Sequence, residues 1–360
     1  MSNAQCPMFL VYIQSYPIYH DLITADGWLA LENRDKWMPA ITAELGHDVE
    51  LWGVSDHDRV VEYNWKEGVS VTIRLFKADY TPAKTKHHRS SGMIEHAKKH
   101  PADYYIIKGI DGGAGVHLVD AFLAPNKIPF AFVIGGKCTS KQFHHAHSIF
   151  YESDVQLPEI TAPYWTLTGR KRTAAHLIKL PKSVDTDRFK PMPEIDAVND
   201  LISAGRLISY YKNFDDLFNL SSDLRVAFIG GGPLLDENRA KWPNIHWFGS
   251  VPNSDVASRL NTSKAFFYPS KRDYFPRAIV EASACGLPVL CFDDHVGADV
   301  VPDSIGMRLS KSSYRESIMD LFSDPAHLKQ MGDNAREFAL KNYGKESTRQ
   351  AVESLIKLLP

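Results

Sequence analysis

Residues 265–291 read AFFYPSKRDYFPRAIVEASACGLPVLC, and this stretch decides the fold. The apolar and aromatic run Ala265–Tyr268 predicts a short buried strand. Pro276 predicts the first position of a helix, because its missing N–H would be unpaired there in any case. Small and apolar residues over Ala278–Cys285 suit a helix packed closely on a sheet, and Gly286 predicts its end. A second apolar run follows, so the stretch predicts a strand, a helix and a strand of a parallel α/β sheet.

Two acidic residues bracket the turn before this helix. Asp273 lies in the loop and Glu281 on the helix, with seven residues between them. The helix N-terminus is predicted at the carboxyl end of a strand, where ligands bind in open α/β sheets. Its exposed N–H groups and its dipole favour an anion. A carboxylate accepts two hydroxyl hydrogen bonds, so this pair suits a hydroxyl-rich phosphate ester. The alternative is a plain strand–helix–strand unit whose acids are incidental.

The composition is that of an ordinary globular protein. The 360 residues are 44% hydrophobic and 23% charged, which is enough for two domain cores. A net charge of −2 and a pI near 6.7 disfavour nucleic acid and membranes as partners. The basic stretch 84–100 has no interleaved aromatic residues, so it is interpreted as a solvated face. Four cysteines without metal-ligand spacing, and no apolar run long enough to cross a membrane, indicate a cytoplasmic protein.

The opening stretch resembles the acid-x7-acid donor motif of retaining GT-B glycosyltransferases, in particular the family 4 enzymes (glycosyl transferases group 1). The family helix usually reads Glu-Ala-Met-Ala-Cys-Gly-Leu-Pro-Val, and this chain has Glu-Ala-Ser-Ala-Cys-Gly-Leu-Pro-Val from Glu281 to Val289. Before the helix the family has Glu-Gly-Phe-Gly, whereas this chain has Asp-Tyr-Phe-Pro from Asp273 to Pro276. The resemblance implies a GT-B fold, in which two Rossmann-like parallel-sheet domains face each other across a cleft.

A second resemblance sets the expected domain boundaries. Residues 180–191, LPKSVDTDRFKP, resemble the family's IPNGVDTDRFKP connector. It implies an acceptor-side domain over residues 1–192, a nucleotide-sugar donor domain over 193–343, and a C-terminal helix over 344–360 that crosses back to the first domain. Residues 314–331 and 333–358 predict helices. In the first domain, strands are predicted at Phe9–Ile13, Val49–Val54, Val69–Leu75, Tyr104–Ile107 and Ile128–Ile134.

The resemblance also assigns donor-binding residues. Arg206 ends the first strand of the second domain, and Lys212 follows six positions later. The family uses such a pair on the donor diphosphate, where negative charge builds as the glycosidic bond breaks; the alternative is a surface Arg and Lys. The implied catalytic residues are Asp273, Glu281, Arg206 and Lys212. The implied donor-binding residues are Arg206, Lys212, Gly232, Val251, Asp273, Tyr274, Phe275, Pro276 and Glu281.

The first half departs more from the family. The family's Gly-Gly loop is missing, and Arg34 is the candidate that replaces it, unless that loop is simply solvated. Lys108 and His117 flank a Gly-rich turn, where His117 is either an acceptor-side group or a packed, helix-capping residue. Gly135 occupies the position of the family's cleft histidine. We take these four residues as the acceptor side, and we expect no metal site.

The first functional hypothesis is a retaining glycosyltransferase that moves a sugar from a nucleotide-diphosphate sugar to a carbohydrate or other hydroxyl acceptor. The donor is a co-substrate, and neither a metal ion nor another cofactor is expected. The alternative is a catalytically impaired GT-B nucleotide-sugar binding protein or partner subunit, which Gly135 favours. A GT-B sugar-nucleotide epimerase is a third possibility, but it needs further acids and histidines that the sequence does not place. The sugar, the base, the acceptor and the oligomeric state are not specified.

Overall fold

The computed structural model describes residues 6–14, 24–30, 36–81, 87–136, 138–166, 169–208, 214–269, 273–293 and 296–359, with the backbone alone for 164–166. Arg34 and Lys212 lie outside the described residues. The chain divides into two compact units. Unit 1 comprises Met1–Glu152, Gln156–Leu180 and Thr348–Pro360, and unit 2 comprises Ser153–Val155 and Pro181–Ser347. The connector segment from Pro181 onward is therefore part of unit 2.

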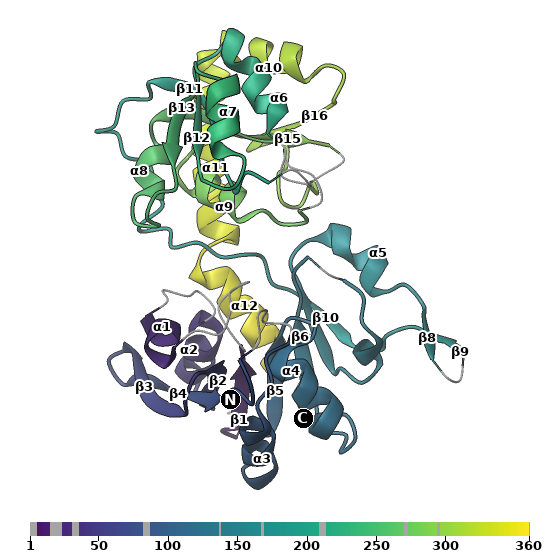
Figure 1. Cartoon of the computed structure of the whole chain (residues 1–360). Helices are drawn as coiled ribbons and strands as arrows, with labels where there is room; N and C mark the ends of the chain where they lie inside the picture. Colours follow the sequence, from purple (N-terminus) through teal and green to yellow (C-terminus); the bar gives the residue numbers. More distant parts are fainter. Residues whose placement is uncertain are drawn as a thin grey trace, which may run out of the picture. The chain divides into compact units, whose positions relative to one another are not determined.

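Unit 1 is built on a largely parallel sheet (Figure 1). Its described strands are β1 Phe9–Ile13, β2 Asp48–Ser55, β3 Arg59–Lys66, β4 Val69–Lys77, β5 Tyr104–Lys108, β6 Phe130–Val133, β7 Ser148–Tyr151 and β10 His176–Lys179, with a separate hairpin of β8 Tyr164–Thr166 and β9 Gly169–Lys171. The order in the main sheet is β10-β7-β6-β5-β1-β2-β4-β3, and only β3 at the edge pairs antiparallel. The described helical segments are α1 Ala25–Ala30, α2 Trp37–Glu44, α3 Ser91–Lys99, α4 Gly113–Leu118, η3 Val119–Leu123, η4 Lys141–His144, η5 Asp154–Gln156 and α5 Leu157–Ile160, of which η5 straddles the boundary with unit 2.

The five strands predicted in the first half are all present. Strand β1 has the predicted bounds, and the other four differ at their ends by one or two residues. Strand β3 was not predicted; it pairs antiparallel with β4 at the sheet edge, and its side chains alternate between half-buried and exposed. An edge strand with one solvated face has a weaker apolar signal than a buried parallel strand.

The core of unit 1 includes residues from the far end of the chain. Helix α12 spans Lys345–Ile356, and its residues from Thr348 onward belong to unit 1. Ala351, Val352 and Leu355 are buried in the same apolar cluster as Leu10 of β1. Arg349 on this helix donates a hydrogen bond to Glu44 of α2. Apolar burial and an ion pair thus hold the end of the chain in this core.

Unit 2 is a doubly wound sheet whose described strands are all parallel (Figure 1). They are β11 Asn199–Ala204, β12 Val226–Ile229, β13 His246–Gly249, β14 Ser263–Tyr268, β15 Val289–Phe292 and β16 Gly306–Leu309, in the order β13-β12-β11-β14-β15-β16. The described helical segments are α6 Asp215–Phe218, η6 Asn219–Ser222, α7 Leu235–Lys241, α8 Val256–Leu260, α9 Arg277–Ala284, α10 Tyr314–Ser323 and α11 Pro325–Asn342. Residues from α8 and α9 belong to one buried apolar cluster of the sheet and residues from α6 and α10 to another, so the sheet is covered on both faces.

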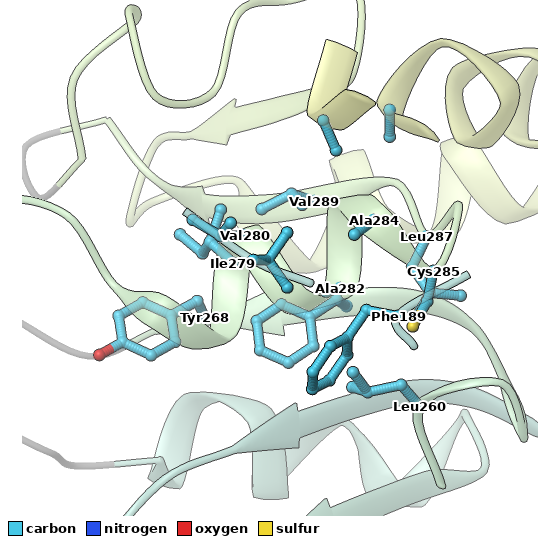
Figure 2. Packing of buried hydrophobic residues seen from close by; sticks show 14 of the residues in the cluster. Phe189, Leu260, Tyr268, Ile279, Val280, Ala282, Ala284, Cys285, Leu287 and Val289 are labelled. Carbon is cyan, nitrogen blue, oxygen red and sulfur yellow. The ribbon is translucent and has the colours of Figure 1, made fainter. Parts of the chain in front are cut away.

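The strand–helix–strand unit predicted from residues 265–291 is present as β14, α9 and β15. Gly286 ends α9 with a φ of +77°. Its N–H donates to the carbonyl of Ser283, and the N–H of Leu287 donates to the carbonyl of Ala282, which is the Schellman arrangement. Figure 2 shows apolar side chains of α9 packed together, with Tyr268 at the edge of the cluster and its hydroxyl pointing away.

The C-terminal helices are interrupted at two positions, and neither is the predicted one. Helices were predicted over 314–331 and 333–358, but α11 continues through residue 332 and the structure has three helices, α10, α11 and α12. The prediction was wrong at Asp324, whose side chain accepts from the N–H of His327 and caps α11, with Pro325 in the first turn. The second break falls at Tyr343–Gly344. No helix in the described part of the chain is long and apolar enough to cross a bilayer.

Candidate functional site

The candidate site lies where the strand order of unit 2 reverses. Strands β11 and β14 are neighbours, with Leu201 paired to Ala265. From β11 the sheet continues in one direction through β12 and β13, and from β14 in the other through β15 and β16. This is the topological switch point at which open α/β sheets bind ligands. Arg206 follows β11 and Asp273 follows β14, so both lie in loops at the carboxyl ends of these two strands.

The loop that carries Arg206 is fastened to the glycine run by backbone hydrogen bonds. The N–H of Gly205 donates to Ile229 at 3.0 Å, and that of Leu207 donates to Gly231 at 2.9 Å. Gly230 has a φ of +137°, and a Cβ there would lie 1.9 Å from the Gly205 carbonyl oxygen. Only glycine permits this approach. The Arg206 side chain is exposed, and no described residue forms a hydrogen bond or ion pair with it.

Gly232 and Val251 lie in the two neighbouring loops. A Cβ at Gly232 would lie 2.5 Å from the carbonyl oxygen of Leu207, so this loop also touches the one that carries Arg206. The N–H of Gly230 donates to the carbonyl of Gly249, two residues before Val251, at 2.8 Å. Val251 is half-buried against the unit 2 core. The structure therefore joins the three loops after β11, β12 and β13 into one platform.

The N-terminus of α9 has none of the usual neutralising groups. Pro276 is the N-cap, with φ −66° and ψ 124°, rather than the predicted first helical residue, and it offers no side-chain hydrogen bond. No acidic residue lies in the first turn, whose first residue is the exposed Arg277. Helix N-termini normally have a Ser, Thr, Asp or Asn cap and acidic first-turn residues. Among the described residues, neither a side-chain cap nor a first-turn carboxylate therefore offsets the positive dipole end of α9.

The two acids of the motif are both half-buried. The hydroxyl of Tyr268 donates to the Asp273 carboxylate at 3.0 Å, which fixes its orientation. Glu281 lies one turn before Cys285 on α9. Burial first, and then the negative charge of Glu281, raise the pKa of the Cys285 thiol to about 12. Cys285 is therefore a neutral core residue, and Glu281 is the acidic residue of this helix.

Three positions between the acids differ in accessibility. Tyr274 is half-buried, whereas Phe275 and Pro276 are buried. The Phe275 ring packs edge-on against Tyr343, with ring centroids 5.5 Å apart. The side chains of Phe275 and Pro276 therefore belong to the core, and donor binding at these two positions stays a prediction. Their backbone shapes the turn.

Lys182, which the sequence analysis did not select, contacts this turn. Its Nζ donates to the Phe275 carbonyl oxygen at 2.6 Å, and its side chain is half-buried. The sequence feature that could have identified Lys182 lies in the connector, where the resembling family has Asn and this chain has Lys. The contact joins residues 93 positions apart, so spacing within one motif could not reveal it.

The predicted acceptor-side residues occupy unit 1. Lys108 is the exposed last residue of β5, and Gly135 follows the neighbouring β6. The Gly135 carbonyl accepts a hydrogen bond from Gln156 Nε2 at 2.5 Å. His117 is half-buried on α4, and its Nδ1 has no partner among the described residues. Burial and the nearby positive charge of Arg89 lower the pKa of His117, which favours the neutral imidazole.

Metal ligands do not gather in the described part of the chain. No group of three or more His, Cys, Asp or Glu side chains there could hold a metal ion. Arg34 and Lys212 belong to the residues outside the description, so the predicted cationic pair is represented by Arg206 alone.

Comparison with known proteins agrees with this architecture. Residues 186–338 match the family model described as glycosyl transferases group 1. The chain is 32% identical over 149 residues to a subunit of phosphatidylinositol N-acetylglucosaminyltransferase from Arabidopsis thaliana, covering 36% of this chain and 32% of that protein. It is 24% identical over 198 residues to alpha-galactosylglucosyldiacylglycerol synthase of Streptococcus pneumoniae, covering 48% and 52%. The matches thus span about a third to a half of these relatives' lengths.

Solved structures resemble nearly the whole chain. Sucrose-phosphate synthase from Thermosynechococcus elongatus superposes with a TM-score of 0.71 at 14% identity, over 98% of this chain and 99% of that one. HepE from Anabaena, solved in complex with UDP, superposes with a TM-score of 0.67 at 12% identity, over 97% and 99%. At such identities the likeness concerns the fold. The chain therefore has the GT-B fold, and its residues 186–338 match the family model of glycosyl transferases group 1.

Proposed function

We propose that the chain is a retaining glycosyltransferase that moves a sugar from a nucleotide-diphosphate sugar to a hydroxyl acceptor without a metal ion. One observation carries the proposal: Arg206 and the uncapped N-terminus of α9 follow the two neighbouring strands at which the sheet of unit 2 reverses. An exposed guanidinium and a free helix N-terminus at such a point suit a diphosphate.

The proposed roles follow from the chemistry of each group. Arg206, the α9 N-terminus and Lys212 would stabilise the diphosphate, whose negative charge grows as the bond to the sugar breaks. These groups supply the positive charge that a metal ion supplies in other transferases. Glu281 would accept hydrogen bonds from the ribose hydroxyls, and Asp273, held by Tyr268, from the sugar hydroxyls. The departing phosphate would take the acceptor's proton, so no protein base is required.

The names of similar proteins support the substrate classes. HepE was solved with UDP and with UDP-glucose, which supports a uridine diphosphate sugar as the first donor to test. The relatives from Arabidopsis and Streptococcus are named for phosphatidylinositol and for a glucosyldiacylglycerol. A hydroxyl on a glycolipid is therefore the first acceptor class to test.

The decisive experiment has two stages. Thermal shift and calorimetric titration with UDP, GDP and their glucose and mannose esters should identify one donor that raises the melting temperature. That donor should then be hydrolysed slowly to the nucleoside diphosphate without acceptor, in the presence of EDTA, with the sugar released first as the anomer present in the donor. Failure to bind any of these nucleotides would overturn the donor assignment, whereas an inverted anomer or loss of turnover in EDTA would overturn the mechanism.

A second candidate function rests on Gly135. The resembling family has a histidine at this position, whereas Gly135, two residues after β6, has no side chain. If the chain is an impaired nucleotide-sugar binding protein or a partner subunit, it should bind the donor with the same thermal shift and release no nucleoside diphosphate. The hydrolysis stage therefore separates the two candidates.

A further inference from the structure

The connector segment that carries Lys182 is a fixed part of unit 2. Two residues after Lys182, the N–H of Val184 donates to the Tyr343 carbonyl at 2.7 Å, and the Val184 side chain is buried. Further along, Phe189 is buried in the core, and Arg336 of α11 donates to its carbonyl at 2.8 Å. The backbone that presents Lys182 is thus anchored by burial and hydrogen bonds on its C-terminal side.

Lys182 braces the turn that leads into α9. Its ammonium donates to the carbonyl oxygen of Phe275, whose ring is anchored against Tyr343. Pro276 follows and has its φ fixed by its ring. The resembling family has two flexible glycines in this turn. In this chain the turn is instead held by the hydrogen bond from Lys182 to the Phe275 carbonyl, by the packing of the Phe275 ring and by the fixed φ of Pro276. The turn also carries Asp273 and leads directly into the first turn of α9.

The positive charge of Lys182 also affects the N-terminus of α9. The Phe275 carbonyl carbon is bonded to the nitrogen of the N-cap residue Pro276, so the Lys182 ammonium lies within about one Debye length, ~8 Å at physiological ionic strength, of the first turn of α9. A cation beside a helix N-terminus opposes the helix dipole. Arg277 adds a second exposed cation in the same turn. This concentration of positive charge is unfavourable for the helix alone and becomes favourable when an anion is bound.

We propose that Lys182 is a positioning residue for the diphosphate of the donor. It holds the turn Asp273–Pro276 in the donor-binding geometry through the Phe275 carbonyl, and it adds positive charge to the anion site at the N-terminus of α9. This inference rests on the proposed function. It assigns to the connector, at a position where the resembling family has Asn, a role in binding as well as in joining the units.

The test compares Lys182→Met with Lys182→Arg and Lys190→Met in the full chain. Methionine preserves the length and apolar stem of lysine and removes the charge and the hydrogen bond. Arginine keeps both. Lys190 is exposed on the same connector, and among the described residues its ammonium has no partner, so Lys190→Met controls for the change in net charge. UDP, GDP and uridine are titrated by calorimetry at 50 mM and 300 mM NaCl, and the melting temperature of each variant is recorded.

We expect Lys182→Met to lower the affinity for the bound diphosphate roughly tenfold at 50 mM NaCl and by a smaller factor at 300 mM, because salt screens the lost charge. Uridine affinity should be unchanged, and Lys182→Arg and Lys190→Met should bind within about threefold of wild type. If Lys182→Met lowers only the melting temperature, or weakens uridine and UDP equally, the residue has a purely structural role and the inference is wrong. If the wild-type chain binds neither UDP nor GDP, the proposed donor site fails first and this inference with it.

Discussion

The hydroxyl of Tyr268, the last residue of β14, donates a hydrogen bond to the carboxylate of Asp273 at 3.0 Å. The Tyr268 ring is buried in the unit 2 core, so the strand itself orients the leading acid of the motif. A carboxylate held in this way keeps its remaining lone pairs for other donors, such as sugar hydroxyls. The interaction links the fold of the sheet directly to the proposed chemistry.

We predict that Tyr268→Phe lowers donor turnover about three- to tenfold while UDP affinity stays unchanged, because Asp273 loses its orienting bond and its proposed partner is the sugar and not the nucleotide. Steady-state donor hydrolysis and UDP titration measure the two effects. Tyr343→Phe is the control, since it also removes a buried hydroxyl, one that donates to the Val300 carbonyl at 2.6 Å. Equal loss of turnover in both variants would mean that Tyr268 acts through stability alone.

Glu281 should distinguish nucleotides by their ribose. If its carboxylate accepts from the ribose hydroxyls, wild type should bind UDP roughly tenfold more tightly than 2′,3′-dideoxy-UDP. Glu281→Gln should lose most of that preference and bind both compounds with similar affinity. A variant that keeps the full wild-type preference would remove Glu281 from the ribose site.

Arg206→Ala should lose roughly 2–4 kcal/mol of transition-state stabilisation, measured as the fall in kcat/KM for donor hydrolysis. Arg225 offers a matched control. Arg225 lies just before β12, at the amino ends of the parallel strands, whereas the switch point lies at their carboxyl ends. Its guanidinium donates to the Asp200 carboxylate at 3.1 Å. Arg225→Ala should leave turnover unchanged. Wild-type turnover in Arg206→Ala would end the assignment of the diphosphate to this loop.

Gly230→Ala should destabilise unit 2 by roughly 2–4 kcal/mol, because the new methyl group would meet the Gly205 carbonyl and the backbone lies at positive φ. Gly231→Ala is the informative comparison. A Cβ there meets only the Ser250 hydroxyl, at 2.3 Å, and that side chain can rotate away, so the cost should be below about 1 kcal/mol. Urea unfolding measures both. Equal costs would show that the close contact of these two loops is not what requires glycine.

Local patterns predicted the backbone around α9 in unit 2. The Gly-rich turns, Pro276 and Gly286 have backbone requirements that few residues meet, so their positions can be inferred from the sequence. The apolar runs likewise predicted five strands of unit 1 and the strands β14 and β15 of unit 2, but not β7, β10 or β16. The edge strand β3 was missed because one of its faces is solvated, and the break at Asp324 was missed although an Asp N-cap followed by Pro325 is a helix-start signal.

Contacts between distant positions could not be predicted in this way. Lys182 meets Phe275 across 93 positions, and Arg349 meets Glu44 across 305. Neither pair shares a motif or a period, and each depends on tertiary packing that composition does not encode. For the same reason the sequence suggested Phe275 as a ligand contact, whereas packing against Tyr343 makes its ring part of the core.

The Glu44 cluster predicts how unit 1 responds to acid. The Glu44 side chain is 9% exposed and accepts hydrogen bonds from Lys66, from Trp65 at 2.6 Å and from Arg349 of α12. Burial alone would raise the pKa of Glu44, but these bonds outweigh it and lower the pKa to about 2. Because the pKa is lowered in the folded state, the stabilisation is complete above about 4.5, the ordinary value, and is lost as the pH falls toward 2.

Glu44→Gln should therefore lower the free energy of unfolding by about 1 kcal/mol at pH 7, with a difference that narrows at pH 3. Urea unfolding followed by tryptophan fluorescence at pH 7, 5 and 3 provides the measurement. Glu95→Gln is the control, because the Glu95–Lys98 pair is exposed and should give no measurable change at any of these pH values. If the loss in free energy of unfolding caused by Glu44→Gln stays constant from pH 7 to pH 3, Glu44 contributes through packing and not through its charge. In that case the ion pair with Arg349 does not hold α12 in the core of unit 1.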